Sequence, residues 1–147
     1  MTTENRKAID EAQIRTLIDD WANALRAKDA GAVVSHYGDN VMFVLAPPLQ
    51  VAGSRDTKNL EAWFSTWQGS IGYEIRDLTI TTGDDVAFCH SLNRMSGTNS
   101  DGDEIDMWFR ETLGLRKIDG KWMITHEHSS VPFYMDGSYK AAVDLKP

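Results

Sequence analysis

The chain of 147 residues is 41% hydrophobic and 25% charged, with a net charge of −7. This size and composition are typical of one globular domain with a substantial core, so we expect a single domain over residues 1–147. The negative charge disfavours nucleic acid and anionic membranes as partners. With Cys89 as the single cysteine, no internal disulfide framework can form. No secretion signal or membrane-spanning run is recognisable, and we expect a cytoplasmic protein.

The first part of the sequence predicts three helices. Apolar residues recur at helical spacing in residues 7–28, which indicates an amphipathic helix. Asp29 is a suitable N-cap for a short second helix that Gly38 can end, and Ser54 for a third. The apolar stripes of these helices carry the aromatic residues Trp21, Tyr37, Trp63 and Trp67.

Strands are expected between and after these helices. Residues 41–46 form an apolar run before Pro47-Pro48, and residues 51–53 suggest a brief strand. The apolar residues change from odd to even positions near Arg76-Asp77, and this change predicts a bulge in the strand there. Later strands are expected at residues 86–96, 104–118 and 121–131. The tail, residues 134–147, shows no clear period, and we expect it to be partly mobile.

Asp119-Gly120 predicts a two-residue β-hairpin turn, which fixes the pairing of the flanking strands. In a regular ladder Leu113 then pairs with His126, and Glu111 with His128. The predicted inward face carries Met107, Phe109, Glu111, Leu113, Leu115, Trp122, Ile124, His126, His128 and Ser130. On the outer face we expect an ion pair between Arg110 and Glu127. The alternative, Arg110 as a carboxylate clamp, would require the two faces to be exchanged.

Helices followed by long consecutive strands indicate an α+β fold, with helices on one face of an antiparallel sheet. The segments WANALRAKDAGAVVSHYGDNV and LRKIDGKWMITHEHSSVPF resemble the SnoaL-like, ketosteroid-isomerase-homologue branch of the nuclear transport factor 2-like superfamily. The resemblance implies a cone-shaped (cystatin-like) fold, a strongly curved sheet and a pocket at the wide end. It also implies a dimer through the outer sheet face.

The sequence departs from the isomerases at their functional positions. By this resemblance their helix tyrosine falls at Trp21, their general base at Leu45, and their protonated aspartate near Leu113. None of these three side chains can transfer a proton, so we do not expect steroid isomerisation by that mechanism. The location of the pocket can still carry over.

His126, His128 and Glu111 are the candidate catalytic residues. In the predicted register they share one face, and the carboxylate of Glu111 could orient the imidazole of His128 for acid/base chemistry. The alternatives are a structural hydrogen-bond network and a divalent metal with Glu111 or His90 as third ligand. We expect no cofactor and no tightly held metal, because the histidines and the carboxylate can satisfy one another.

The sequence therefore predicts a small-molecule-binding protein, and its candidate activity is acid/base catalysis of the isomerase, cyclase or hydratase type on a hydrophobic or aromatic small molecule. The expected ligand-binding residues are Trp21, Phe43, Leu45, Trp63, Met107, Phe109 and Leu113. A non-catalytic ligand-binding or assembly module is the alternative. We also expect a homodimer, because Trp108, Met123 and Val131 leave apolar surface on the predicted outer face.

Overall fold

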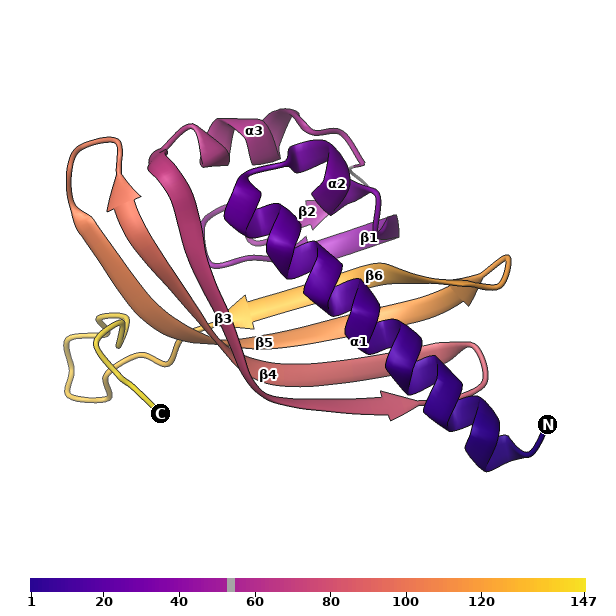
Figure 1. Cartoon of the computed structure of the whole chain (residues 1–147). Coiled ribbons are helices and arrows are strands. Elements are labelled where there is room, and N and C mark those ends of the chain that lie inside the picture. Colours follow the sequence, from indigo (N-terminus) through magenta and orange to yellow (C-terminus); the bar gives the residue numbers. More distant parts are fainter. Residues whose placement is uncertain (53–54) are drawn as a thin grey trace.

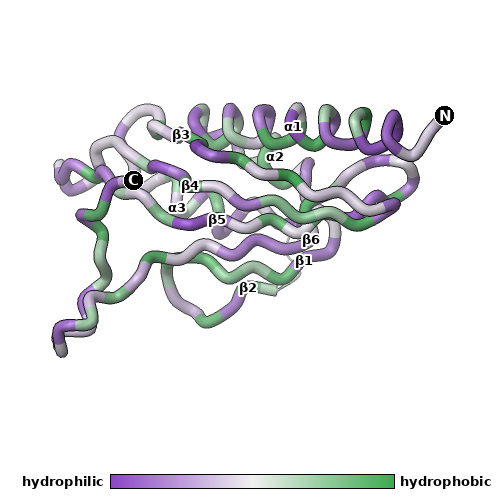
Figure 2. The backbone as a smooth tube through the Cα atoms, turned by 90° about the horizontal axis from the view of Figure 1, so that it is seen from below, coloured by the Kyte–Doolittle hydropathy of each residue, from purple (hydrophilic) through white to green (hydrophobic). Residues whose placement is uncertain are grey.

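A long helix packed across one face of a curved sheet dominates the structure (Figure 1). The computed structural model describes residues 1–52 and 55–147. Helix α1 (Thr3–Ala27) lies across the sheet, and seen from below the two form separate layers (Figure 2). The short helices α2 (Ala30–Val34) and α3 (Lys58–Phe64) lie near strands β1 and β2. The predicted α+β arrangement is therefore confirmed.

Local sequence signals explain where the helices begin and end. The side chain of Asp29 accepts a hydrogen bond from the backbone N–H of Ala32 at 3.1 Å, which confirms its predicted role as an N-cap. The predicted cap of the third helix, Ser54, lies outside the described residues. Trp67, expected on that helix, instead begins a strand, because the hydroxyls of Ser65 and Thr66 bond back to carbonyls of the last turn at 2.6 Å. None of the described helices is long and apolar enough to cross a membrane.

In the described part of the chain, six strands form one sheet in the order β2-β1-β6-β5-β4-β3. Their bounds are Tyr37–Phe43 (β1), Val51–Ala52 (β2), Trp67–Thr82 (β3), Val86–Asn99 (β4), Glu104–Ile118 (β5) and Lys121–Ser130 (β6). Strand β1 begins earlier than predicted, so Tyr37 and Gly38 belong to it and not to α2. The sheet is mixed, because β1 runs parallel to β6. The expectation of a wholly antiparallel sheet is wrong at this pair. Parallel neighbours need a long connection, and the chain between β1 and β6 provides it.

Irregularities in β3 bend the sheet around the helices. The pairing of β3 with β4 shifts between Arg76 and Thr79, and Asp77 has a φ of 57°. This confirms the bulge predicted at Arg76-Asp77. Long strands that change direction here give the sheet its curvature (Figure 1).

The central hairpin turns where the sequence predicts. Asp119 and Gly120 have φ angles of 50° and 79°, as a two-residue turn with both central residues at positive φ requires. Ile118 pairs with Lys121, and the side chain of Trp122 is buried as expected. The predicted register is therefore correct for the first half of the hairpin.

Beyond Ile124 the predicted register is wrong. Leu115 pairs with Ile124, but the next pair is Gly114 with His126, so Thr125 is an extra residue on β6. One extra residue exchanges the two faces of the rest of the strand. The following pairs are Leu113 with Glu127, Thr112 with His128, Glu111 with Ser129, and Arg110 with Ser130.

The tail folds back on the end of β6. Phe133 forms an isolated bridge with Ala141, and the backbone N–H of Ala142 donates to the carbonyl of Pro132 at 2.8 Å. The side chain of Ala142 is buried. The sequence pattern did not indicate this local structure; mobility of residues 134–147 stays a prediction.

Candidate functional site

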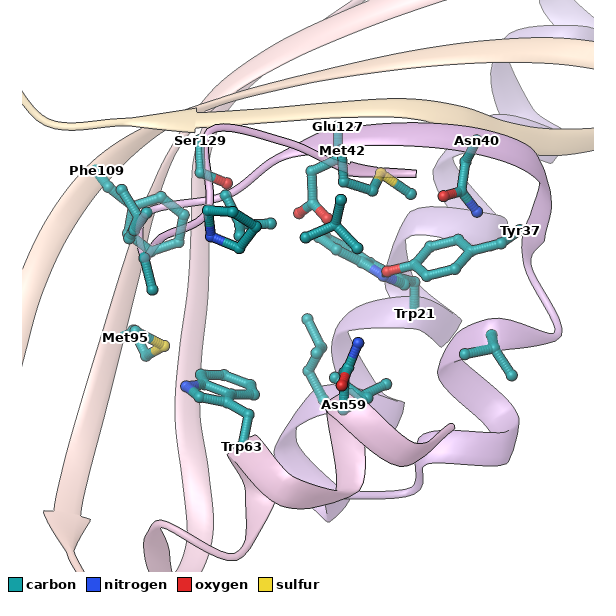
Figure 3. Close-up of a pocket in the computed structure, with 18 of the residues that line it drawn as sticks. Trp21, Tyr37, Asn40, Met42, Asn59, Trp63, Met95, Phe109, Glu127 and Ser129 are labelled. Carbon is teal, nitrogen blue, oxygen red and sulfur yellow. The ribbon is translucent and has the colours of Figure 1, made fainter. Parts of the chain in front are cut away.

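A cavity of about 540 Å³ lies between the helices, the segment after β1 and the inner face of the sheet (Figure 3). Its walls are formed by Trp21, Leu25, Val34, Tyr37, Asn40, Met42, Val44, Leu45, Ala46, Pro47, Pro48, Val51, Asp56, Asn59, Leu60, Trp63, Tyr73, Met95, Phe109, Glu127 and Ser129. This volume is within the range of sites that bury a small organic molecule.

Aromatic rings from both layers define the apolar part of the cavity. The rings of Trp21 and Tyr73 meet edge to face with centroids 5.8 Å apart, and those of Tyr73 and Phe109 at 6.2 Å. Trp63 comes from α3 and lies across the open space from Phe109 (Figure 3). Such rings offer large flat surfaces for an apolar or aromatic molecule.

Few of the described residues that line the cavity have polar side chains, and two of these side chains are acidic. Glu127 and Ser129 project from β6, Asn40 from β1, and Asp56 and Asn59 from the region of α3. Among the described lining residues there is no lysine, arginine or histidine. The cavity therefore offers a carboxylate to its occupant but no cation to an anionic one.

Two tyrosine hydroxyls of the cavity wall are held by buried donors. Trp21 Nε1 donates to the hydroxyl of Tyr37 at 3.2 Å, and Asn93 Nδ2 donates to the hydroxyl of Tyr73 at 2.8 Å. Ser91 fixes that amide by donating to Asn93 Oδ1 at 2.6 Å. Since each tyrosine oxygen accepts a bond, its own O–H proton remains free to be donated.

Both tyrosines stay protonated at ordinary pH. Burial raises the pKa of Tyr37 well above its usual value, and the negative charge of Glu127 raises it further. Burial likewise raises the pKa of Tyr73, with added contributions from the charges of Glu111 and Glu127. These side chains can therefore donate hydrogen bonds but do not serve as bases.

Behind Glu127 lies a second, deeply buried carboxyl group. Glu111 is 3% exposed, and Ser129 Oγ donates to its Oε2 at 2.6 Å. Its Oε1 has no hydrogen-bond partner among the described residues. Burial raises the pKa of Glu111 well above its usual value, and the charge of neighbouring Glu127 raises it further.

Four of the seven predicted ligand-binding residues line the cavity: Trp21, Leu45, Trp63 and Phe109. Leu113 is instead part of the buried core. Met107 pairs with the cavity residue Met95 but is not itself part of the wall. Phe43 lies against the rings of His126 and His128, with centroids 4.8 Å and 5.2 Å away.

The two histidines do not reach the cavity, so the predicted placement of His126 and His128 is wrong. The bulge at Thr125 turns them to the face that carries Phe43, where His126 Nδ1 lies 2.6 Å from the carbonyl oxygen of Val41. The predicted pair of His128 with Glu111 does not form, because Glu111 is opposite Ser129. Within residues 1–52 and 55–147 no group of three His, Cys, Asp or Glu side chains is arranged to hold a metal ion.

Glu127 is the site residue that the sequence reasoning misplaced. It was expected to pair with Arg110 outside the cavity, but Arg110 Nε donates to Ser130 Oγ at 3.1 Å and Glu127 faces inward (Figure 3). The bulge has the same effect on Val131, which packs against the core and not on the outer face. Because Glu127 lies between two polar residues, the alternation of apolar and polar residues does not indicate which face of the strand it occupies. Its orientation depends on the bulge at Thr125.

The chain is similar to several solved structures. A nuclear transport factor 2-like protein of unknown function from Pseudomonas putida shares 34% identity with a TM-score of 0.85, over 95% of this chain and 98% of that one. A ketosteroid isomerase-like protein from Erwinia carotovora atroseptica shares 26% identity with a TM-score of 0.69, over 81% and 93%. A protein of unknown function with a cystatin-like fold from Nostoc punctiforme, 17% identical with a TM-score of 0.70 over 88% and 96%, shows the fold alone.

A comparison with curated proteins found no significant match. Residues 14–134 match the SnoaL-like domain family. This match covers most of the chain and agrees with the helices, the curved sheet and the structural neighbours described above. The chain therefore belongs to the SnoaL-like domain family of the nuclear transport factor 2-like superfamily.

Proposed function

We propose that this protein is an acid/base enzyme acting on an uncharged, largely apolar small molecule, with Glu127 as the group that takes and returns a proton. The observation that carries the proposal is the half-buried carboxyl of Glu127 in an aromatic cavity that also presents two tyrosine hydroxyls. A positioned base and positioned donors are the two elements that proton transfer next to a carbonyl group needs. The likeness to a ketosteroid isomerase-like protein agrees with this class of reaction.

The proposed step begins with a ketone bound between the aromatic walls. The carboxylate of Glu127 accepts a proton from the carbon next to the carbonyl group, and the electron pair of that C–H bond moves to the carbonyl oxygen. The O–H of Tyr37 or Tyr73 donates a hydrogen bond to this oxygen as it gains negative charge. In a β,γ-unsaturated ketone the proton returns from Glu127 to the γ-carbon, the C=O bond re-forms and the C=C bond moves into conjugation with it, so that the isomerisation is balanced. In a ketone without that C=C bond the proton returns to the same carbon, and the result is exchange of hydrogen with the solvent.

The charge of the cavity limits the substrate class. The described wall has two acidic side chains and no basic one, so a carboxylate or phosphate ester would enter without a counter-ion. Burying an unpaired charge is strongly unfavourable, whereas burying an apolar ring is favourable. The substrate class that suits this wall is therefore a neutral monocyclic or bicyclic ketone.

Exchange of carbon-bound hydrogen for deuterium tests the proposal without knowledge of the natural product. The full-length protein is incubated in D₂O with 2-tetralone, a neutral bicyclic ketone, and loss of the proton signal is followed by NMR. Glu127→Gln should lower the catalysed rate by about two to four orders of magnitude. Glu104→Gln, an exposed carboxyl on β5, is the matched control and should leave the rate unchanged. Equal exchange in Glu127→Gln and wild type would contradict the proposed role.

A non-catalytic binding module is the second candidate, and the extensive aromatic wall favours it. Trp21 and Trp63 line the cavity, so an occupant should change tryptophan fluorescence. Saturable binding of 2-tetralone without any protein-dependent exchange would support the binding module against the enzyme.

We also propose a homodimer formed through the sheet face opposite α1. Trp108 and Met123 are only half-buried there, and Phe88 on the adjacent strand is 49% exposed. Large apolar side chains left partly exposed on one sheet face are typical of a protein interface. Sedimentation equilibrium at micromolar concentration should give twice the chain mass of 16.5 kDa; the monomer mass would contradict the proposal. For location we propose the cytoplasm, where buried Cys89 would remain a free thiol.

A further inference from the structure

Glu111 and Glu127 are close neighbours on the inner face of the central hairpin. In the observed register Glu111 is opposite Ser129, and Glu127 is opposite Leu113. The two carboxyl groups therefore lie diagonally across adjacent strands, within reach of each other's long side chains. Glu127 opens to the cavity, whereas Glu111 lies behind it in the core.

The surroundings of Glu111 do not suit a carboxylate anion. The hydroxyl of Ser129 is a single neutral donor, and the second oxygen, Oε1, has no partner in the described part of the chain. Asp10, equally buried, shows what an ionised carboxylate receives in this protein: its Oδ1 accepts hydrogen bonds from Lys117 Nζ at 2.8 Å and from Trp122 Nε1 at 3.1 Å. A buried charge without such partners is strongly destabilising.

We infer that Glu111 and Glu127 form a carboxyl pair that holds one proton, with Glu111 as the positioning residue that carries it and Glu127 as the ionised group facing the cavity. This inference deepens the proposed function, because it explains how one of two adjacent acids is kept ready to accept a proton. Protonated Glu111 keeps its bond from Ser129 through Oε2, and Oε1 is the oxygen free to carry the hydrogen. Two adjacent carboxyl groups that share a proton titrate as a unit.

The pair has a consequence for the proposed step. When Glu127 accepts the substrate proton, both carboxyl groups are neutral and the inner wall carries no charge at that point. When the proton returns, Glu127 regains the single negative charge. Glu111 keeps its proton throughout, so it acts on Glu127 and does not touch the substrate.

The titration of glutamate carboxyl groups tests the pair directly. The full-length protein is labelled with glutamate carrying ¹³C in the side-chain carboxyl, and the carbon signals are followed by NMR as the pH changes. One signal should titrate well above the ordinary glutamate pKa of about 4.3. That signal should vanish in Glu111→Gln, whose amide can replace a protonated carboxyl. In Glu127→Gln its midpoint should fall by about one unit or more, as expected for coupled groups.

Two further variants complete the design. Ser129→Ala removes the donor that stabilises ionised Glu111 and should raise the midpoint, which keeps the test available should Glu111→Gln fail to fold. Glu104→Gln should leave the high signal in place. The inference is overturned if all glutamates titrate in the ordinary range, or if Glu127→Gln leaves the high midpoint unchanged, since burial alone would then explain it. No substrate is involved, so failure of the pair and failure of the proposed enzyme are separate results.

Discussion

Replacing Asp10 by alanine should weaken the fold strongly, because its carboxylate joins α1 to the central hairpin. Asp10 is 2% exposed and accepts hydrogen bonds from Lys117 and Trp122 through one oxygen. Trp122 is itself buried, so its indole N–H would have no acceptor in the variant. The side chain of Lys117 is 25% exposed and can turn towards water at lower cost.

The magnitude follows from these contacts. A hydrogen bond to a charged group contributes about 1.5–3 kcal/mol, and a buried donor left without a partner costs about 1–3 kcal/mol. The expected loss in free energy of unfolding is therefore about 3–5 kcal/mol, as for other broken buried ion pairs. In a domain of this size, that loss lowers the melting temperature by about 6–20 °C, at roughly 2–4 °C per kcal/mol.

Urea unfolding at neutral pH measures this loss. Asp19→Ala, which removes an exposed carboxylate from the same helix, is the matched control and should change stability by less than about 0.5 kcal/mol. A loss below about 1 kcal/mol in Asp10→Ala would refute the reasoning, because it would show that neither the ion pair nor the buried N–H matters.

The same contribution should depend on pH. Burial alone would raise the pKa of Asp10, but the hydrogen bonds from Lys117 and Trp122 and the charge of Lys117 outweigh it, and the pKa is lowered. A folded-state pKa below the unfolded value of about 3.9 means that the stabilisation is present above that pH. It is lost as the pH falls through the folded value, so wild type and Asp10→Ala should converge in acid.

Other parts of the structure give three further predictions. Burial raises the pKa of the Cys89 thiol to about 11, so a disulfide reagent at pH 8 should label it only in urea; rapid labelling of the native protein would contradict its burial. A Cβ at Gly114 would lie 3.2 Å from the Cβ of His126, so Gly114→Val should cost about 1–3 kcal/mol in urea unfolding; unchanged stability would argue against this pairing. Trp63→Ala should weaken 2-tetralone binding in calorimetry about tenfold or more, whereas Trp108→Ala on the outer face should not.

Short-range signals in the sequence determined much of the fold. The Asp119-Gly120 turn, the Asp29 cap and the bulge at Arg76-Asp77 were all predicted from a few neighbouring residues, and the structure confirms them. Each depends on backbone conformation or on alternation within one strand, so no distant contact is needed to decide it. The apolar residues of the cavity wall in helices α1 and α3 were predicted for the same reason.

Only the tertiary structure decided which acid faces the cavity. As far as Ile124, the alternation of apolar and polar residues indicates which face of the sheet each side chain occupies. The next six residues are all polar, so the sequence gives no such indication for them. The face is settled by contacts from β1, which is far away in sequence: Val41 bonds to His126, and Phe43 packs against both histidines. One extra residue at Thr125 accommodates these contacts and turns Glu127 inward, because a single residue is half of the strand period.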